Sequence, residues 1–510
     1  MLLAAICLYM LATIGIGLYA SRRVHGAKDF MVAGRSLPLY MNFACVFATW
    51  FGAETLLSIS ATFTKDGLKG VSGDPFGAAM CLTLVALFFA KAFYRMDLLT
   101  IGDFYHKRYG KVVEVVTSIA ITISYLGWTS AQMTALGLVI YVLGNSGLTI
   151  DQISAHPNIG LNSAILIGSV IVTFYTLFGG MWSVALTDLV QTAAIVIGLI
   201  IVAAIIGQQA GGIGTVIQAA HADGKFQLFP TGGAKSWFIF IGAFLTFAIG
   251  SIPQQDIFQR VTSAKDENTA VVGTLAGGLF YFFFAFVPMF IAYSAVVIDP
   301  NYKALFASED SREIQQILPH LIINSTPVWT QILFFGALLS AILSTASGTL
   351  LAPSSLFTEN VLQPFLHKLD DKHLLTVLRF VLVFFSIAAT TIAFYSTSTM
   401  YEMVQNAYKV TLVAAFVPLA MGVYWSRAST QGAIGSIVLG LAVWLGFEFA
   451  IGWKSPADSE SPYALVPPQL WGLLGAFIGM VSGSLLPQWI PQAEVDHEEI
   501  SNKTRASIGH

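Results

Sequence analysis

The stretch ATWFGAETLL, residues 48–57, places a glycine and a glutamate inside an apolar segment long enough to span a membrane. A glycine weakens a helix, and a carboxylate buried in hydrocarbon is strongly unfavourable. Both residues are tolerated if the helix is interrupted here, because unwound backbone at membrane depth occurs where it lies in protein or lines a water-filled cavity. We therefore predict a broken membrane helix with its break at WFGAET.

The composition is that of a polytopic membrane protein. Of 510 residues, 55% are hydrophobic and 10% are charged, with a mean hydropathy of +0.72. Soluble domains carry about 25% charged residues. The net charge of −3 offers no basic surface for nucleic acid, and the three cysteines lie in apolar segments, which disfavours a disulfide framework or a metal site. Nothing in the sequence indicates an obligate protein partner, so the lipid bilayer is the expected surrounding.

Apolar runs separated by glycine, proline and charged residues predict an all-α fold with about thirteen transmembrane helices. The expected spans cover 2–20, 38–63, 75–96, 113–143, 160–179, 181–207, 236–257, 271–297, 328–356, 373–395, 401–424, 431–452 and 468–489. We expect one transmembrane domain over residues 1–490 and a disordered polar tail over 491–510. Most of the 25 lysines and arginines lie on one side of this topology, which predicts an outside N-terminus and a cytoplasmic C-terminus.

A second interruption lies at GSIPQQD, residues 250–256, in the seventh expected span. If the first span is set aside, the two broken helices become the first and sixth of ten. Interrupted helices in matching positions indicate an inverted repeat of five plus five helices with its binding site near the membrane midplane. The core would cover about 38–424, and the carbonyls freed at the breaks are suitable ligands for a hard cation.

The ninth span, GALLSAILSTASGTLLAPSS at 336–355, gathers Ser344, Thr345, Ser347 and Thr349 among aliphatic residues. Small hydroxyl residues also let helices approach closely, or bond back to their own carbonyls. Opposite a broken helix, the same hydroxyls become candidate sodium ligands. Sodium accepts hydroxyl and carbonyl oxygens without the cost of burying a full carboxylate.

Four segments resemble signatures of the sodium:solute symporter family: DFMVAGRSLP (29–38), TIGDFYHKRYG (100–110), FGGMWSVALTDLVQ (178–191) and LSTASGTLLAPSS (343–355). The resemblance extends over about 1–490. It is strongest to high-affinity choline transporters and looser to proline and pantothenate symporters. It implies a LeuT-like core of ten helices with one extra helix before and two after. It also implies secondary transport driven by sodium, not enzyme catalysis.

The resemblance also implies a set of sodium ligands. On matching positions these are the carbonyls of Ala53, Leu56 and Ala341 and the hydroxyls of Ser344 and Thr345. Asp188 matches an acid on the family's cytoplasmic ion path, although a buried acid that caps or pairs near the membrane surface is an equal alternative. Ser347 stands where an acidic residue often follows the hydroxyl pair, so the resemblance gives no support for a second ion.

The solute site resembles the choline cage only in part. Trp50 and Trp128 match two cage aromatics, but Gln254 replaces a third, and an alanine within 75–80 replaces a fourth. An amide offers directed hydrogen bonds in place of a cation–π surface. We therefore expect a small organic solute with an apolar part and hydrogen-bonding groups, such as an amine, an amino acid or a related metabolite. Gln132, one turn from Trp128, would share the pocket.

Glu54 leaves three alternatives open. It forms a structural ion pair with Lys409, the one lysine inside a span, with Glu402 or Gln405 as other partners of that lysine. Alternatively it contacts a cationic solute, or it carries a coupled proton. Intramembrane charges are functional candidates by default, but the sequence does not choose among these roles.

The sequence as a whole predicts a sodium-coupled symporter of the plasma membrane that imports a small organic solute by alternating access. A proton-coupled transporter of the same fold and a transporter-like membrane sensor are the alternatives. The motifs HExxH, GxSxG and GxxxxGK[ST] do not occur, so hydrolase and ATPase chemistries lack their usual carriers. A channel seldom needs two aromatic residues beside an ion site.

Overall fold

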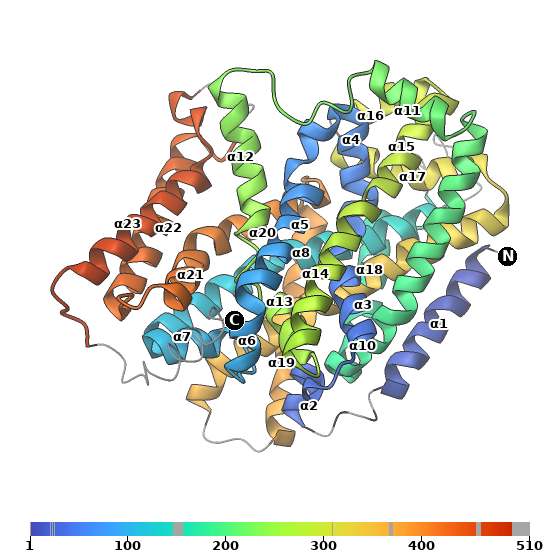
Figure 1. Ribbon diagram of the computed structural model, residues 1–510. Helices are drawn as coiled ribbons and strands as arrows, with labels where there is room; N and C mark the ends of the chain where they lie inside the picture. The colour runs from blue at the N-terminus through green and yellow to red at the C-terminus, as the bar shows by residue number, and fades with distance from the viewer. Residues whose placement is uncertain are drawn as a thin grey trace.

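The computed structural model describes residues 2–20, 22, 24, 26–145, 157–308, 310–366, 371–454 and 461–491, so the expected tail lies almost wholly outside the described residues. The described part is nearly all helical (Figure 1). Short 3₁₀ and π segments connect or interrupt the α-helices, which are α1 (Leu2–Ala20), α2 (Ala27–Val32), α3 (Leu39–Trp50), α4 (Ser60–Asp66), α5 (Ala78–Leu84), α6 (Ala90–Arg95), α7 (Ile101–Tyr109), α8 (Lys111–Gly144), α10 (Leu161–Gln209), α11 (Ile213–Ala222), α12 (Ala234–Ala248), α13 (Gln255–Ser263), α14 (Glu267–Phe284), α15 (Phe286–Ile298), α16 (Asn301–Phe306), α17 (Ser311–Ser325), α18 (Val328–Leu356), α19 (Asp371–Tyr395), α20 (Met400–Thr411), α21 (Val417–Tyr424), α22 (Thr430–Ala450) and α23 (Pro468–Leu485).

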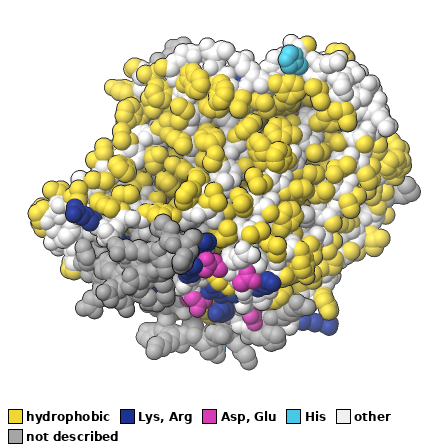
Figure 2. All heavy atoms as spheres, in the orientation of Figure 1, with side chains coloured by type: hydrophobic (Ala, Val, Ile, Leu, Met, Phe, Trp, Pro, Cys, Tyr) yellow, Lys and Arg dark blue, Asp and Glu magenta, His cyan; other side chains and the backbone are white. Residues whose placement is uncertain are grey.

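The surface shown in Figure 2 is a broad apolar band, with charged side chains gathered along its lower part. Within the described residues, nine helices are long and apolar enough to cross a membrane, or ten if the bent pair Leu39–Trp50 and Glu54–Asp66 is one span. The expected count of thirteen is therefore not confirmed. The spans expected at 160–179 and 236–257 contain shorter apolar helices, Leu161–Phe174 and Ala234–Ala248.

The predicted break at WFGAET is present. Helix α3 ends at Trp50, because Phe51 has φ −86° and ψ 72°, outside the helical region. The chain becomes helical again in the π-helical turn Glu54–Ile59, which continues into α4, and the two parts are bent by 55°. The 48–57 stretch therefore marks the end of one helix and the start of another.

The second predicted break is also present, between the end of α12 and the start of α13. The two broken helices lie side by side, because the Asn42 side chain of α3 donates to the Arg260 carbonyl of α13 over 2.7 Å. Arg260 Nε returns a bond of 2.9 Å to Thr49 Oγ1. The breaks in the two halves are thus brought to the same region of the fold.

Helices α10 and α18 both pack against α3, the helix that ends at the first break. Helix α10 is interrupted at Gly180, whose φ of +53° favours glycine, and a Cβ there would lie 2.6 Å from the Phe30 ring. The part of α10 after Gly180 packs along α18, whose residues 337–356 are all buried. The hydroxyl cluster therefore lies in the protein interior and not against lipid.

Candidate functional site

The hydroxyl pair of α18 faces the last turn of α3. Ser344 Oγ lies 3.2 Å from the Ala48 carbonyl oxygen, and Thr345 Oγ1 lies 3.3 Å from the carbonyl oxygens of both Ala48 and Thr49. Ser344 Oγ also donates to Asp188 Oδ1 of α10 over 2.5 Å. Oxygens from three helices therefore converge at the point where α3 ends.

The carbonyls that lie within hydrogen-bonding distance of this pair are those of Ala48 and Thr49, so the expected sodium role of Ala53 and Leu56 stays a prediction. Both residues follow the break, and the Leu56 carbonyl accepts instead from Ser60 Oγ over 2.5 Å. The carbonyls that meet the hydroxyls precede the break, because the last turn of a helix has carbonyls without intrahelical partners. Ala341 lies in α18 three residues before Ser344 and is fully buried. The end of α3 is the signal that would have identified Ala48 and Thr49.

Asp188 is fully buried beside the hydroxyl pair. Its carboxylate also lies within hydrogen-bonding reach of Cys45 and interacts electrostatically with Arg260. Among the described residues, its Oδ2 atom has no hydrogen-bond partner. A buried carboxylate oxygen next to two hydroxyls and two carbonyls is a donor set that suits a hard monovalent cation.

Trp50 directly follows Ala48 and Thr49, whose carbonyls meet the hydroxyl pair, and its ring contacts three other aromatic rings. We call Trp50, Trp128, Tyr281 and Tyr408 the aromatic cage. The ring centroid of Trp50 lies 6.2 Å from that of Trp128, 6.0 Å from Tyr408 and 6.3 Å from Tyr281. Trp128 and Tyr408 are 5.6 Å apart. The structure thus brings the two predicted tryptophans together and adds two tyrosines that the sequence reading missed.

The two predicted glutamines border the cage in different ways. Gln132 Nε2 donates to Glu54 Oε2 over 2.6 Å. Gln254 directly precedes α13, and its Nε2 atom lies 3.1 Å from Ser124 Oγ and 3.3 Å from Thr411 Oγ1. Within the described part of the chain, the Gln254 Oε1 atom has no partner. It is an acceptor open to a donor from a bound molecule.

Glu54 is held by neutral donors, and the ion pairs among the described residues do not include the alternative of a Glu54–Lys409 pair. Its Oε1 atom accepts from Trp128 Nε1 over 3.1 Å, in addition to the bond from Gln132. Lys409 interacts electrostatically with Glu448 and Glu402 instead. The sequence places Lys409 in a span but does not show which neighbouring helix its side chain faces.

A second buried carboxylate, Asp74, is bonded to the cage residue Tyr281 and was not among the predicted site residues. It accepts a hydrogen bond from the Tyr281 hydroxyl, and Thr55 Oγ1 lies 3.1 Å from the same hydroxyl. Asp74 is only 2% exposed. The stretch GDPFG, which places a charged residue directly before the span expected at 75–96, is the signal that would have found it.

Gly52 makes room for the Glu54 carboxylate, which folds back over the break. A Cβ at Gly52 would lie 2.9 Å from Glu54 Cδ. We expect Gly52→Ala to displace the carboxylate and to lower solute affinity about tenfold, measured as the half-saturating concentration for uptake. Gly446→Ala is the matched control, because a Cβ there meets nothing within 4 Å. Equal affinity of the two variants would contradict this role of Gly52.

A wide cavity of about 800 Å³ is lined in part by residues of α4, α12 and α16, which lie in the upper part of Figure 1. Its lining includes Ser58, Lys65, Asp66, Tyr401 and Glu402. The Tyr401 ring stacks on Phe247 at 5.4 Å, and Phe247 lies 5.2 Å from the cage residue Tyr408. Two stacked rings therefore separate this cavity from the cage.

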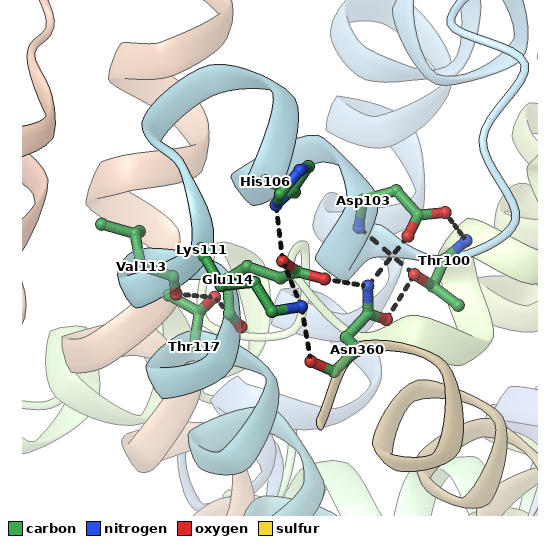
Figure 3. Close-up of polar contacts among 8 residues, drawn as sticks. All are labelled: Thr100, Asp103, His106, Lys111, Val113, Glu114, Thr117 and Asn360. Atoms are coloured by element: carbon green, nitrogen blue, oxygen red, sulfur yellow. Dashed lines mark hydrogen bonds and ion pairs between the residues drawn. The ribbon is translucent and has the colours of Figure 1, made fainter. Parts of the chain in front are cut away.

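A polar network surrounds Asn360, which follows α18 (Figure 3). Asn360 Nδ2 donates to Asp103 Oδ1 and to Glu114 Oε1, both over 2.8 Å, while Thr100 Oγ1 donates to Asn360 Oδ1 over 2.6 Å. Lys111 Nζ lies 2.9 Å from Glu114 Oε2. The network joins the end of α18 to α7 and α8.

Asn360→Ala removes three of these hydrogen bonds and leaves buried acceptors unpaired. We expect a loss of about 3 kcal/mol of stability, seen as a lower thermal midpoint of the purified protein. Asn406→Ala, at an exposed position on α20, is the control. An Asn360→Ala midpoint equal to that of the control would show that the network is not stabilising.

Comparison with known proteins agrees with this geometry. The sequence profile of the sodium:solute symporter family matches residues 30–440. The high affinity choline transporter 1 of Homo sapiens is 27% identical over 450 residues, covering 86% of this chain and 75% of the relative. The osmoregulated proline transporter OpuE of Bacillus subtilis (strain 168) is 24% identical and covers 94% and 93%.

Solved structures share the fold. A Na⁺-coupled sialic acid symporter in a substrate-bound outward-open state superposes with a TM-score of 0.77 at 18% identity, over 95% of this chain and 98% of that one. The nucleobase-cation-symport-1 family transporter Mhp1, in a closed conformation, gives a TM-score of 0.58 at 14% identity, over 93% and 98%. At these identities the likeness establishes the arrangement of the helices alone.

Proposed function

Because the chain belongs to the sodium:solute symporter family, we propose that it imports a small organic solute together with sodium by alternating access. The observation that carries the proposal is the approach of Ser344 and Thr345 to the carbonyls of Ala48 and Thr49 beside Asp188. Sodium would bind among these oxygens and Ala341, with Asp188 supplying negative charge. Ala53 and Leu56 would contribute to the solute side of the break.

Ion and solute are coupled because their sites share the end of one helix. Thr49, whose carbonyl meets Thr345, is followed directly by the cage residue Trp50. An ion that fixes the last turn of α3 against α18 also fixes the position of the Trp50 ring. Each ligand then favours the arrangement that the other needs, which is positive coupling between two sites.

The two sides of the cage support the proposed direction of access. The large cavity lined by Tyr401 would give entry from one side, and the Asn360 network would hold α18 against α7 and α8 on the other (Figure 3). Charged side chains gather along the lower part of the face in Figure 2. With the positive-inside rule, this supports a cytoplasmic lower side and an outside N-terminus in the plasma membrane.

The test is uptake into proteoliposomes of radiolabelled amines, amino acids and related metabolites. An inward sodium gradient is expected to drive accumulation of at least one solute, and an equal potassium gradient is not. Proton-coupled transport is the second candidate, favoured by the buried carboxylates Glu54 and Asp74. Accumulation driven by a proton gradient in sodium-free buffer would establish that candidate and overturn sodium coupling.

A further inference from the structure

The interior of the protein holds more negative than positive charge. Among the described residues, the buried ionisable acids and bases are Glu54, Asp74, Arg108, Glu114, Asp188, Asp256, Arg260 and Glu448. A buried charge without a partner is strongly unfavourable, so each member of this set needs a compensating charge or ligand.

Most of these groups have a compensating partner within the chain. Glu114 binds Lys111, and Glu448 interacts with Lys409. Asp256 and Asp188 both interact with Arg260, and Asp188 also borders the proposed sodium position. Arg108, at the lower side, donates to backbone carbonyls.

Glu54 and Asp74 are the exceptions. Only the neutral groups of Trp128, Gln132, Tyr281 and Thr55 bond their carboxylates among the described residues. The two acids are close enough to interact electrostatically with each other. Each is at least 97% buried, since Glu54 is 3% exposed and Asp74 is 2% exposed. Neither carboxylate therefore has a positively charged partner among the described residues.

Both carboxylates bond to aromatic side chains that contact Trp50. Glu54 is bonded to Trp128, and Asp74 is bonded to Tyr281, and both of these rings pack against Trp50. A group of aromatic rings with two carboxylates at its border suits an apolar stem with a positive group at each end, because the rings attract cations and the carboxylates bind them.

The remaining polar atoms around the cage are ready to accept hydrogen bonds. Gln254 and Tyr408 are each 1% exposed. Within the described part of the chain, neither the Oε1 atom of Gln254 nor the hydroxyl of Tyr408 has a hydrogen-bond partner. A quaternary ammonium has no N–H group to offer these acceptors or the carboxylates. Primary ammonium and guanidinium groups do.

We propose that the transported solute is an organic dication with N–H donors at both ends, one bound by Glu54 and the other by Asp74, with its apolar stem against the aromatic cage. This inference rests on the proposed function and adds the chemical class of the solute to it. Sodium balances Asp188, and the solute itself balances the two cage carboxylates.

The experiment measures thermal stabilisation of the purified full-length protein by diaminobutane, diaminohexane, butylamine, choline and proline, in sodium and in potassium buffer. We expect at least one diamine to act at about a tenfold lower concentration than butylamine or choline, and only in sodium. Butylamine, choline or proline acting as well as both diamines would overturn the dication assignment while leaving sodium symport intact. Equal effects of every solute in sodium and potassium would instead contradict the proposed function.

Variants assign the charges to the two residues. Glu54→Gln and Asp74→Asn are each expected to abolish the preference for the diamine over butylamine. Glu448→Gln, which also removes a buried carboxylate but lies outside the cage, is expected to keep it. A diamine preference that survives both cage substitutions would refute the inference. If a cage variant does not fold, the comparison of diamine with monoamine on the unmodified protein decides alone.

Discussion

Thr345→Ala is expected to lower the apparent sodium affinity of uptake about 10- to 100-fold while the protein still reaches the membrane. The Thr345 hydroxyl approaches two carbonyls at the end of α3, and a bond to a charged group contributes about 1.5–3 kcal/mol. Sodium activation of solute uptake in proteoliposomes gives the measurement. Ser344→Ala should act in the same direction, because its hydroxyl also reaches the Ala48 carbonyl.

Ser354→Ala is the matched control for both variants. Ser354 is buried in the same helix, but its hydroxyl bonds back to the Leu350 carbonyl of that helix over 2.6 Å. The control should keep the sodium affinity of the unmodified protein. If Thr345→Ala keeps it as well, the hydroxyl pair is a packing feature and not an ion site.

Trp50→Ala is expected to reduce solute affinity about 100-fold, because the ring contacts three other aromatic rings, two of which bond the carboxylates of Glu54 and Asp74. Solute-concentration dependence of uptake at saturating sodium measures the effect. Trp50→Phe should lose less, since it keeps an aromatic face. Sodium affinity measured without solute should change far less than solute affinity.

The control for the tryptophan is Trp237→Ala. Trp237 lies on α12, is 41% exposed and stacks on Phe229, so its removal deletes a large aromatic side chain outside the cage. A Trp50→Ala protein with solute affinity equal to that of Trp237→Ala would exclude the cage as the binding site.

The breaks in the helices were predictable from the sequence, whereas the direction of the freed carbonyls was not. Gly52 and Glu54 within an apolar run mark a place where a membrane helix cannot continue. The ψ angle of Phe51 marks where the helix ends, and the Phe51 ring packs against Tyr281 and Phe284 of α14, a neighbour that the local sequence does not specify. For that reason the carbonyls that the hydroxyl pair meets precede the expected ones, and the sodium-binding role of the pair stays a prediction.

Contacts between distant spans were the least predictable part of the site. Residue type indicates that Glu54 needs a partner, but not that Trp128 and Gln132 supply it instead of Lys409. Asp74 and Tyr281 are 207 residues apart in the chain and meet only through the packing of α14 against α3 and α5. Helical periodicity places a residue on a face, whereas the identity of the neighbouring helix comes from the fold.

Equilibrium binding of radioactive sodium to the purified protein tests the central claim most directly. The unmodified protein is predicted to bind sodium saturably, with displacement by unlabelled sodium but not by potassium. The Ser344→Ala/Thr345→Ala double variant, folded as judged by its thermal midpoint, is predicted to lose this binding. Saturable sodium binding of unchanged affinity in the double variant would contradict the account.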